Sequence, residues 1–366
     1  MKKKALIVYG WIIFSLVLQM FAYTMVDKVY LRNRKNIAGD LNQKTIDTTI
    51  SQKEEQVNSI DIPSEAKDLK VSYDGSYVAY MKDNKLNIVD VNTKESKKTI
   101  DNYFLNKDNT LSKTESKIST FKWIPYKNMI MFAMSSLPNA SSRGQVYTYD
   151  LETGNIHVSK NIMYDNYIPW GGEISDIIIS PFTMVYYIRV SSKQNNDRFY
   201  RVDIMDDLYI SVTLPSATIA KIGFYTEDLY YTEGEQKILV KSGLKSPVSI
   251  TMPSNQVLLG IGGTSKEAKD IIYSGILNSE GKVEKIIYGN QSTGASSWKS
   301  IDISKPLERE DFVIKDEEKI YSVGADNTIT ELTSGKKTSF SGKFINVTDT
   351  HVVYHNGDKL YFKTIK

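Results

Sequence analysis

Hydrophobic and polar residues alternate over short stretches through most of the chain, and Gly, Asn or Asp residues separate these stretches. The first clear unit begins at Leu69, turns at Asp74-Gly75 and resumes in residues 77–81. Alternation with a period of two places successive side chains on opposite faces of a strand, and Asp-Gly favours a tight turn. The pattern therefore predicts consecutive antiparallel strands joined by short turns.

Units of this kind recur from about residue 60 to the end of the chain. Spread over seven units, residues 60–366 give about 44 residues each, which suits four-stranded propeller blades. We therefore expect an all-β fold, a seven-bladed β-propeller, although insertions leave six or eight blades open. The last unit supplies only three strands, and a closed ring completes such a blade with strands from both chain ends. We expect residues 56–62 to pair with residues 360–365.

The most hydrophobic segment precedes these units. Residues 5–26 carry no charge and are long enough to cross the roughly 30 Å core of a bilayer as a helix. A cleaved signal peptide is the alternative, but such a peptide needs small residues at its cleavage site. Met20, two positions before Ala22, does not fit. We expect an N-terminal transmembrane helix that remains uncleaved.

The orientation of this helix rests on the short segment before it, since basic residues flank both ends. A four-residue tail ahead of a long folded part is typical of a signal anchor. We therefore expect an extracytoplasmic propeller on a single-pass protein of the cell membrane, in a bacterial cell envelope. The expected parts are a cytoplasmic tail (1–4), a signal-anchor helix (5–26), a polar tether (27–55) and the propeller (56–366).

Composition and charge narrow the range of functions. The chain has 366 residues, no cysteine and a net charge of +3. Most of the basic excess flanks the apolar segment, so the rest of the chain has no positive surplus and is not expected to bind nucleic acid. The absence of cysteine excludes disulfides, thiolate nucleophiles and cysteine-ligated metals.

One unit carries a turn motif that can be compared with known families. It reads Ser72-Tyr73-Asp74-Gly75-Ser76-Tyr77-Val78-Ala79-Tyr80. This resembles the Ser-Pro-Asp-Gly-x-x-Ile-Ala-Tyr signature of TolB-like and dipeptidyl-peptidase-type propellers, which are related in architecture to WD-repeat proteins. Tyr73 replaces the proline, and later units keep the strand pattern but lose Asp-Gly. The resemblance implies a fold over about residues 56–366, and it implies no activity because the motif is a structural turn.

Candidate catalytic and metal-binding groups are sparse. Peptidases of the resembled family carry their serine after the propeller, and this sequence contains no Gly-x-Ser-x-Gly elbow. His351 and His355 have a spacing that converges on a helix, whereas on a strand it separates them by about 13 Å. Residues 260–263, Gly-Ile-Gly-Gly, lack the helix of a phosphate loop and are interpreted as a loop at a strand end. We expect no enzyme activity, metal or cofactor.

Aromatic residues near the expected strand ends are the candidates for partner binding. Trp and Tyr anchor interfaces because they combine a large apolar area with a polar tip. The alternative is that each ring packs between blades. The stretch 164–172 is the preferred candidate, since its two Gly and one Pro indicate a loop. The candidate residues are Trp123, Tyr126, Tyr164, Tyr167, Trp170 and Trp298.

Together these features predict a membrane-anchored binding or scaffolding module of the cell envelope, without enzyme activity and with another envelope protein as its partner. An alternative is a lectin, hydrolase or lyase that acts on polysaccharide or peptidoglycan through carboxylates and aromatic rings of the propeller channel. A third reading is a relative of propeller-bearing peptidases that retains only the substrate-gating ring. A polysaccharide-cleaving propeller would need two facing carboxylates in its channel, which a sequence cannot show.

Overall fold

The computed structural model divides into two compact units, residues 1–54 and 55–366. Within the part of the chain that it describes, no helix is both long enough and apolar enough to cross a membrane. The expected tail, signal-anchor helix and tether lie outside the described residues, apart from the helical positions Ser15 and Gln19. The structure otherwise describes residues 58–365, except for residues 103, 106–110, 113–115, 137–143, 162–171, 184, 192–195, 204–207, 217, 234–236, 265–266 and 316–317.

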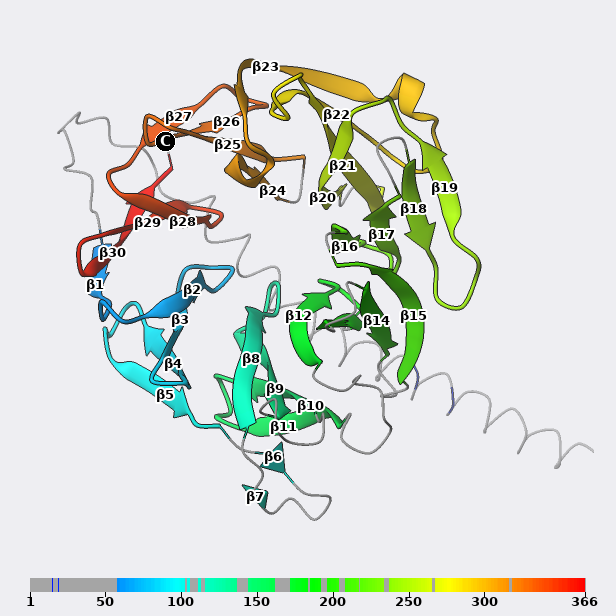
Figure 1. The fold of residues 1–366 in the computed structure, drawn as a ribbon. Helices are drawn as coiled ribbons and strands as arrows, with labels where there is room; N and C mark the ends of the chain where they lie inside the picture. The colour runs from blue at the N-terminus through cyan, green and yellow to red at the C-terminus, as the bar shows by residue number, and fades with distance from the viewer. Residues whose placement is uncertain are drawn as a thin grey trace, which may run out of the picture. The chain divides into compact units, whose positions relative to one another are not determined.

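Seven four-stranded antiparallel sheets follow one another along the second unit and surround a common centre (Figure 1). These sheets are the blades of a β-propeller, so the prediction of an all-β seven-bladed propeller is confirmed. Blades 1 to 3 consist of β2 (Lys67–Val71), β3 (Tyr77–Lys82), β4 (Lys85–Asp90) and β5 (Ser96–Ile100), then β8 (Ser116–Trp123), β9 (Met129–Ser136), β10 (Gly144–Asp150) and β11 (Ile156–Asn161), then β12 (Glu173–Ile179), β13 (Tyr186–Ser191), β14 (Asn196–Val202) and β15 (Leu208–Pro215).

The remaining blades have the same plan, with the first strand innermost. Blades 4 to 6 consist of β16 (Ala220–Ile222), β17 (Leu229–Thr232), β18 (Lys237–Lys241) and β19 (Val248–Thr251), then β20 (Gln256–Thr264), β21 (Lys269–Leu277), β22 (Val283–Gly289) and β23 (Lys299–Leu307), then β24 (Phe312–Ile314), β25 (Ile320–Gly324), β26 (Thr328–Glu331) and β27 (Lys337–Ser339). Blade 7 consists of β28 (Lys343–Val347), β29 (His351–Asn356), β30 (Lys359–Thr364) and β1 (Asn58–Asp61). Outside the blades lie β6 (Phe104–Leu105), β7 (Leu111–Ser112) and the short 3-10 helices η2 (Ala295–Ser297) and η3 (Arg309–Asp311).

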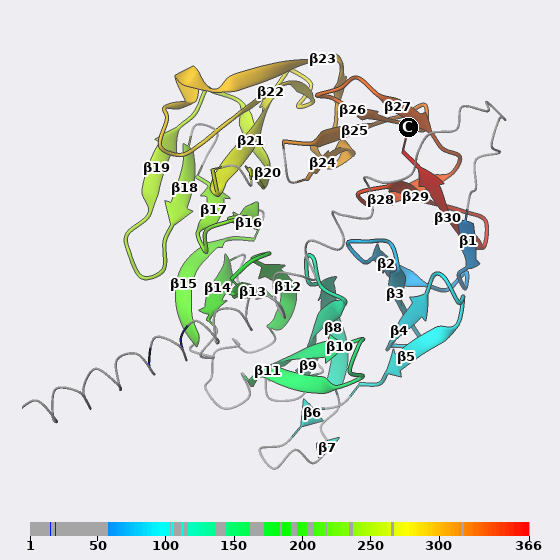
Figure 2. The same cartoon turned by 180° about the vertical axis from the view of Figure 1, so that it is seen from behind.

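Blade 7 is completed by both ends of the propeller. Strand β1 pairs antiparallel with β30 as the outermost strand, with Ile60 opposite Leu360. The two strands lie side by side in both views (Figures 1 and 2). This is the pairing expected for residues 56–62, and β1 covers the edge that β30 would otherwise expose.

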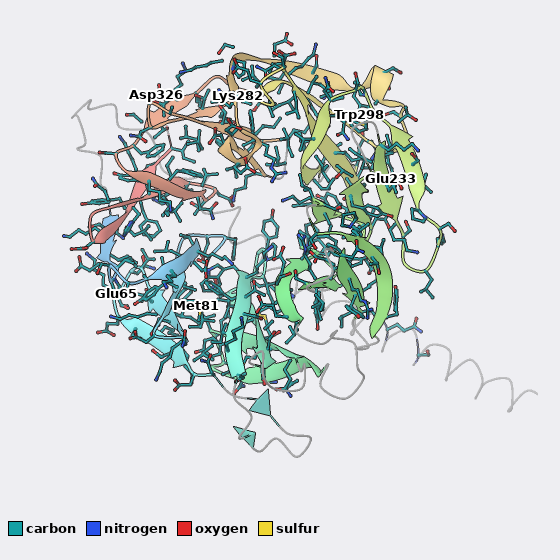
Figure 3. All side chains as sticks on the ribbon, viewed as in Figure 1. Glu65, Met81, Glu233, Lys282, Trp298 and Asp326 are labelled. Atoms are coloured by element: carbon teal, nitrogen blue, oxygen red, sulfur yellow. The ribbon has the colours of Figure 1, made fainter. Side chains whose placement is uncertain are left out.

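The hydrophobic core is divided among the junctions between blades. Seven clusters of buried apolar side chains occur, one at each junction, including the junction between blades 7 and 1. Figure 3 shows the side chains filling the space between neighbouring sheets. Tyr147, Tyr187, Tyr200, Tyr230 and Tyr273 are among the largest fully buried side chains. Packing between blades thus accounts for many of the 24 tyrosines.

The Asp-Gly motif forms the turn between β2 and β3. The Asp74 carboxylate accepts hydrogen bonds from the Ser72 hydroxyl at 2.7 Å and from the Ser76 amide at 2.9 Å. The Ser72 hydroxyl accepts a third hydrogen bond, from the Tyr77 amide at 2.9 Å. Gly75 has a φ of +80°, which glycine adopts without strain. The motif is therefore a structural turn, as its sequence indicates.

Residues 260–263 form part of the inner strand β20, so their interpretation as a loop is wrong. A side chain at Gly260 would meet Ile314 of blade 6 at 2.8 Å, and one at Gly262 would meet the Lys315 carbonyl oxygen at the same distance. These glycines therefore allow close approach between blades, which is one of the reasons for glycine within a strand.

Candidate functional site

Each of the seven blades contributes to one cavity, either through its innermost strand or through its first turn, which links this strand to the second strand. We call this cavity of about 270 Å³ the axial pocket. Innermost strands run in the same direction around a propeller, so the first turns lie at one mouth of its channel. Every blade contributes to the lining, through Tyr73, Tyr126, Pro181, Phe224, Ile261, Ile314 and Asp349 in blade order.

Five aromatic residues of blades 1 to 4 form a continuous arc at this mouth. Tyr73 lies 5.7 Å from Tyr126, which stacks on Phe182 at 5.9 Å, and Phe182 stacks on Tyr225 at 5.0 Å between ring centroids. Phe224 packs edge-on against Tyr126, Phe182 and Tyr225. We call these five residues the aromatic arc. They join the first turns of four successive blades into one apolar surface.

The aromatic arc is accessible to solvent at its middle. Tyr126 is 39% exposed and Phe182 is 44% exposed. Tyr126 also has a φ of +59°, a left-handed conformation that costs a non-glycine residue about 1–2 kcal/mol. Surrounding structure must stabilise such a conformation, and strained positions of this kind cluster at functional sites.

Residues of blade 5 contact the part of the aromatic arc that blade 4 contributes. A side chain at Gly263 on β20 would lie 2.4 Å from the Phe224 ring and 2.5 Å from the Tyr225 ring. The absence of a side chain therefore lets both rings lie against β20. The Tyr225 amide also donates a 2.6 Å hydrogen bond to the buried Asp270 carboxylate of β21. The arc is thereby held in a fixed position by the neighbouring blade.

Two of the predicted binding residues lie at the axial pocket. Trp123, at the end of β8, lines it and donates a hydrogen bond of 3.1 Å from its indole nitrogen to the Lys70 carbonyl oxygen. The Trp123 ring also stacks on Tyr77 at 6.3 Å. Tyr126 lies in the next turn and belongs to the aromatic arc. Trp123 thus joins blade 2 to blade 1, whereas Tyr126 is the more exposed of the two.

The other predicted residues do not join this group. Trp298 is 9% exposed and packs in the cluster between blades 4 and 5. Its indole nitrogen donates to the Thr293 carbonyl oxygen at 3.0 Å, and Figure 3 places it near the periphery. Tyr164, Tyr167 and Trp170 lie outside the described residues.

Four residues of the aromatic arc were missed from the sequence, namely Tyr73, Phe182, Phe224 and Tyr225. Each lies one or two positions after the residue that opens its first turn, which is Ser72, Ser180 or Gly223. Tyr126 likewise lies two positions after Ile124, which opens the first turn of blade 2. Aligning the units on these turns would have shown aromatic residues there in four consecutive blades.

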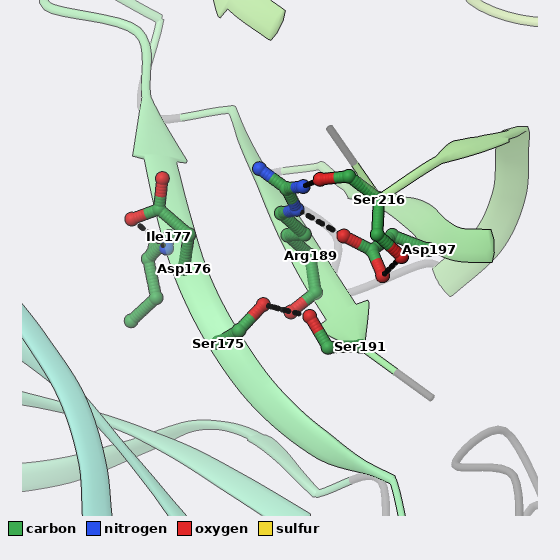
Figure 4. A network of polar contacts seen from close by, with 7 residues as sticks. All are labelled: Ser175, Asp176, Ile177, Arg189, Ser191, Asp197 and Ser216. Atoms are coloured by element: carbon green, nitrogen blue, oxygen red, sulfur yellow. Dashed lines mark hydrogen bonds and ion pairs between the residues drawn. The ribbon is translucent and has the colours of Figure 1, made fainter. Parts of the chain in front are cut away.

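Polar groups lie deeper in the channel, on the inner strands. On β12 a bulge between Ile174 and Asp176 interrupts the pairing with β13, and the Asp176 carboxylate turns back to accept a 2.9 Å hydrogen bond from the Ile177 amide (Figure 4). The carboxylate also pairs with Lys122 of blade 2 at 2.8 Å. Elsewhere in blade 3, Arg189 pairs with the buried Asp197 at 2.5 Å (Figure 4).

The described residues contain no group of three or more His, Asp or Glu side chains arranged to hold a metal ion. His351 and His355 both lie on β29, so the strand spacing of about 13 Å applies to them. The Nδ1 atom of His351 lies 2.7 Å from the Thr350 hydroxyl. The site that the geometry assembles is therefore an apolar pocket with ionic groups below it.

No family model matches the chain, and no curated protein sequence matches it. Among solved structures, oligogalacturonate lyase in complex with manganese is similar, with a TM-score of 0.52 and 10% identity over 85% of this chain and 91% of that chain. The structure of Kluyveromyces lactis Hsv2p is similar with a TM-score of 0.47 and 12% identity over 79% of this chain and 88% of that chain. Dipeptidyl peptidase 4 of Porphyromonas gingivalis is similar with a TM-score of 0.41 and 10% identity over 74% of this chain. This chain spans 44% of the length of that peptidase. At 10% identity, the likeness to the oligogalacturonate lyase structure, whose TM-score exceeds 0.5, concerns the fold alone.

Proposed function

We propose that this protein is a non-enzymatic binding module that receives a segment of another protein at the axial pocket. One observation carries this proposal: all seven blades line the pocket, and three residues of the aromatic arc, Tyr73, Tyr126 and Phe224, are among the lining residues. Aromatic residues dominate the energetics of protein interfaces, because each buries a large area at a small cost in side-chain entropy. An apolar pocket with few polar groups is also the usual form of a binding site.

The arrangement of the rings favours a protein segment over a sugar. Phe182 is stacked on Tyr126 with an interplanar angle of 18° and on Tyr225 with one of 7°. Parallel stacking turns the ring faces of each pair toward each other, so these faces are not available to the C–H groups of a sugar. Lys315 and Asp349 line the other side of the pocket and provide polar contacts for a peptide backbone or side chain.

We also propose that residues 5–26 anchor the protein in the cell membrane of a bacterium, with the propeller outside the cytoplasm in the cell envelope. The uncharged length of this segment supports the anchor. Protease treatment of intact cells is expected to digest the propeller. Digestion only after lysis would contradict this placement.

Affinity capture of the full chain from detergent-solubilised membranes of producing cells tests the binding function. We expect one protein to be recovered in stoichiometric amount with the unchanged chain. The double variant Tyr126→Ala/Phe182→Ala should lose this protein, because it removes the two most exposed rings of the arc.

A matched control removes exposed apolar side chains elsewhere. Leu244, in the turn between β18 and β19, is 79% exposed, and Val248, on β19, is 67% exposed. The double variant Leu244→Ala/Val248→Ala should therefore retain the partner. Equal capture by both double variants would overturn the pocket as the binding site. Recovery of cell-wall polysaccharide in place of a protein would instead support the lectin or hydrolase alternative.

A further inference from the structure

Three lysines occupy equivalent positions on inner strands of the channel. Lys70, Lys122 and Lys221 each lie two residues before the residue that opens the first turn of blades 1, 2 and 4. At about 3.3 Å per residue, they lie roughly 7 Å below the mouth that carries the aromatic arc. We call these residues the lysine layer.

Two members of the layer have partners in the neighbouring blade. The Lys70 ammonium donates a 2.6 Å hydrogen bond to the Phe121 carbonyl oxygen and lies 4.4 Å from the centre of the Phe121 ring. The Lys122 ammonium pairs with Asp176 at 2.8 Å. Both lysines are therefore held in position by contacts with the neighbouring blade.

Lys221 differs, because its ammonium makes no hydrogen bond or ion pair with any residue in the described part of the chain. It lines a cavity of about 240 Å³ together with the apolar residues Ile219, Leu258 and Phe312. Arg309 lies in the same cavity, but its charge is matched by Glu310. Lys221 is thus the cation of this cavity without a counterion.

Lys221 lies on β16, the innermost strand of blade 4, as Lys70 and Lys122 lie on the innermost strands of blades 1 and 2. Burial, followed by the charge of Lys122, lowers the pKa of both Lys70 and Lys221. The Lys221 side chain is nevertheless exposed to solvent. A lowered pKa and an exposed side chain occur together when a group lies on the wall of a cavity that is lined by protein and open to solvent. An incompletely solvated ammonium in such a place gains more from an anion than one on the outer surface.

We propose that Lys221, which shares its level on the innermost strands with Lys70 and Lys122, binds a carboxylate of the protein segment that occupies the axial pocket. The inference rests on the proposed function, and it identifies the partner as a segment with an apolar group next to an acidic one. The apolar group would contact the aromatic arc while the carboxylate reaches the lysine layer. The carboxylate is supplied by a side chain or by a chain terminus.

The probe is 3-phenylpropionate, which joins one ring to one carboxylate, and its uncharged control is 3-phenylpropionamide. Ligand-detected NMR titration of the full chain in detergent should show that the acid binds about tenfold more tightly than the amide, as one charge-assisted hydrogen bond allows. Lys221→Gln should remove this preference. Lys285→Gln, which changes an outer lysine paired with Asp302, should leave it intact.

Equal affinity for the acid and the amide, or an acid preference that survives Lys221→Gln, would overturn the inference. The proposed function would still stand in that case if Tyr126→Ala/Phe182→Ala abolishes capture of the protein partner. Two peptides distinguish the sources of the carboxylate: N-acetyl-Phe-Phe with a free terminus, and N-acetyl-Phe-Glu-amide with a side-chain carboxylate. Displacement of 3-phenylpropionate by either one supports the inference and identifies the source, whereas displacement by neither contradicts it.

Discussion

Tyr230 on β17 donates a hydrogen bond of 3.0 Å to the carboxylate of Asp270 on β21, across the junction between blades 4 and 5. The same carboxylate accepts hydrogen bonds from the Tyr225 amide at 2.6 Å and from the Thr226 hydroxyl at 2.5 Å. Asp270 is only 3% exposed. Burial, and then the charge of Asp270, raises the pKa of Tyr230, so its hydroxyl remains a donor. This buried carboxylate joins blade 5 to the turn that carries part of the aromatic arc.

Asp270→Ala should therefore destabilise the propeller by about 3 kcal/mol, because it leaves several buried donors of blade 4 without an acceptor. Urea unfolding followed by far-UV circular dichroism measures this change. Asp302→Ala is the matched control, since the Asp302 side chain is 85% exposed and should contribute little. If the two variants unfold at the same urea concentration, the cross-blade hydrogen bonds add no stability.

The sequence was sufficient for features that depend on neighbouring residues. Asp74-Gly75 marked a turn, and the alternation of residues 56–62 marked a strand that the last unit lacked. It was insufficient where the contacts cross blades. Asp270 lies 40 residues from Tyr230 along the chain, and nothing local distinguishes it from a solvated acid. The need for glycine at position 263 was equally unpredictable from the sequence, because it arises from two aromatic rings on another blade.

The closure of the ring by β1 should contribute a large share of the stability of blade 7. Ile60 is 2% exposed and packs in one cluster with Leu360 and Phe362. Ile60→Ala should lower the free energy of unfolding by about 3 kcal/mol, the typical cost of truncating a buried isoleucine. The neighbouring Asp61 is 87% exposed, so Asp61→Ala should change the urea midpoint little.

A second measurement separates loss of packing from loss of strand pairing. Deuterium exchange followed by mass spectrometry should show faster exchange in β30 for Ile60→Ala than for Asp61→Ala, since a loosened β1 uncovers the β30 edge. Unchanged exchange in β30 would mean that β1 is dispensable for closure.

Gly263→Val should disturb the aromatic arc without removing any of its rings. The new side chain would occupy the space of Phe224 and Tyr225, so both rings must move. We expect a weaker near-UV circular dichroism signal and loss of the captured partner, while far-UV circular dichroism still reports a folded β protein. Gly294→Ala is the control, because its added carbon would meet no atom closer than 3.8 Å. Partner capture by Gly263→Val equal to that by Gly294→Ala would show that ring placement is unimportant for binding.

Acidification should destabilise the closing blade through His351. This side chain is half-buried on β29, with its ring 6.5 Å from that of Phe362. Burial lowers the pKa of His351 from its ordinary value of 6.5. Between the lowered value and 6.5, the unfolded chain binds more protons at this position than the folded chain, so stability falls as the pH decreases through this range. Below the lowered pKa, both states are protonated and the effect reaches its limit.

The urea midpoint of the unchanged protein should therefore decrease between pH 7.5 and pH 5.5, and His351→Gln should decrease less over the same range. Other titrating groups affect both proteins equally, so the difference between their pH profiles isolates His351. His157→Gln is the matched control, because His157 is exposed on β11 and its loss should leave the profile of the unchanged protein intact. Parallel profiles for His351→Gln and His157→Gln would show that the folded and unfolded states bind the His351 proton equally well.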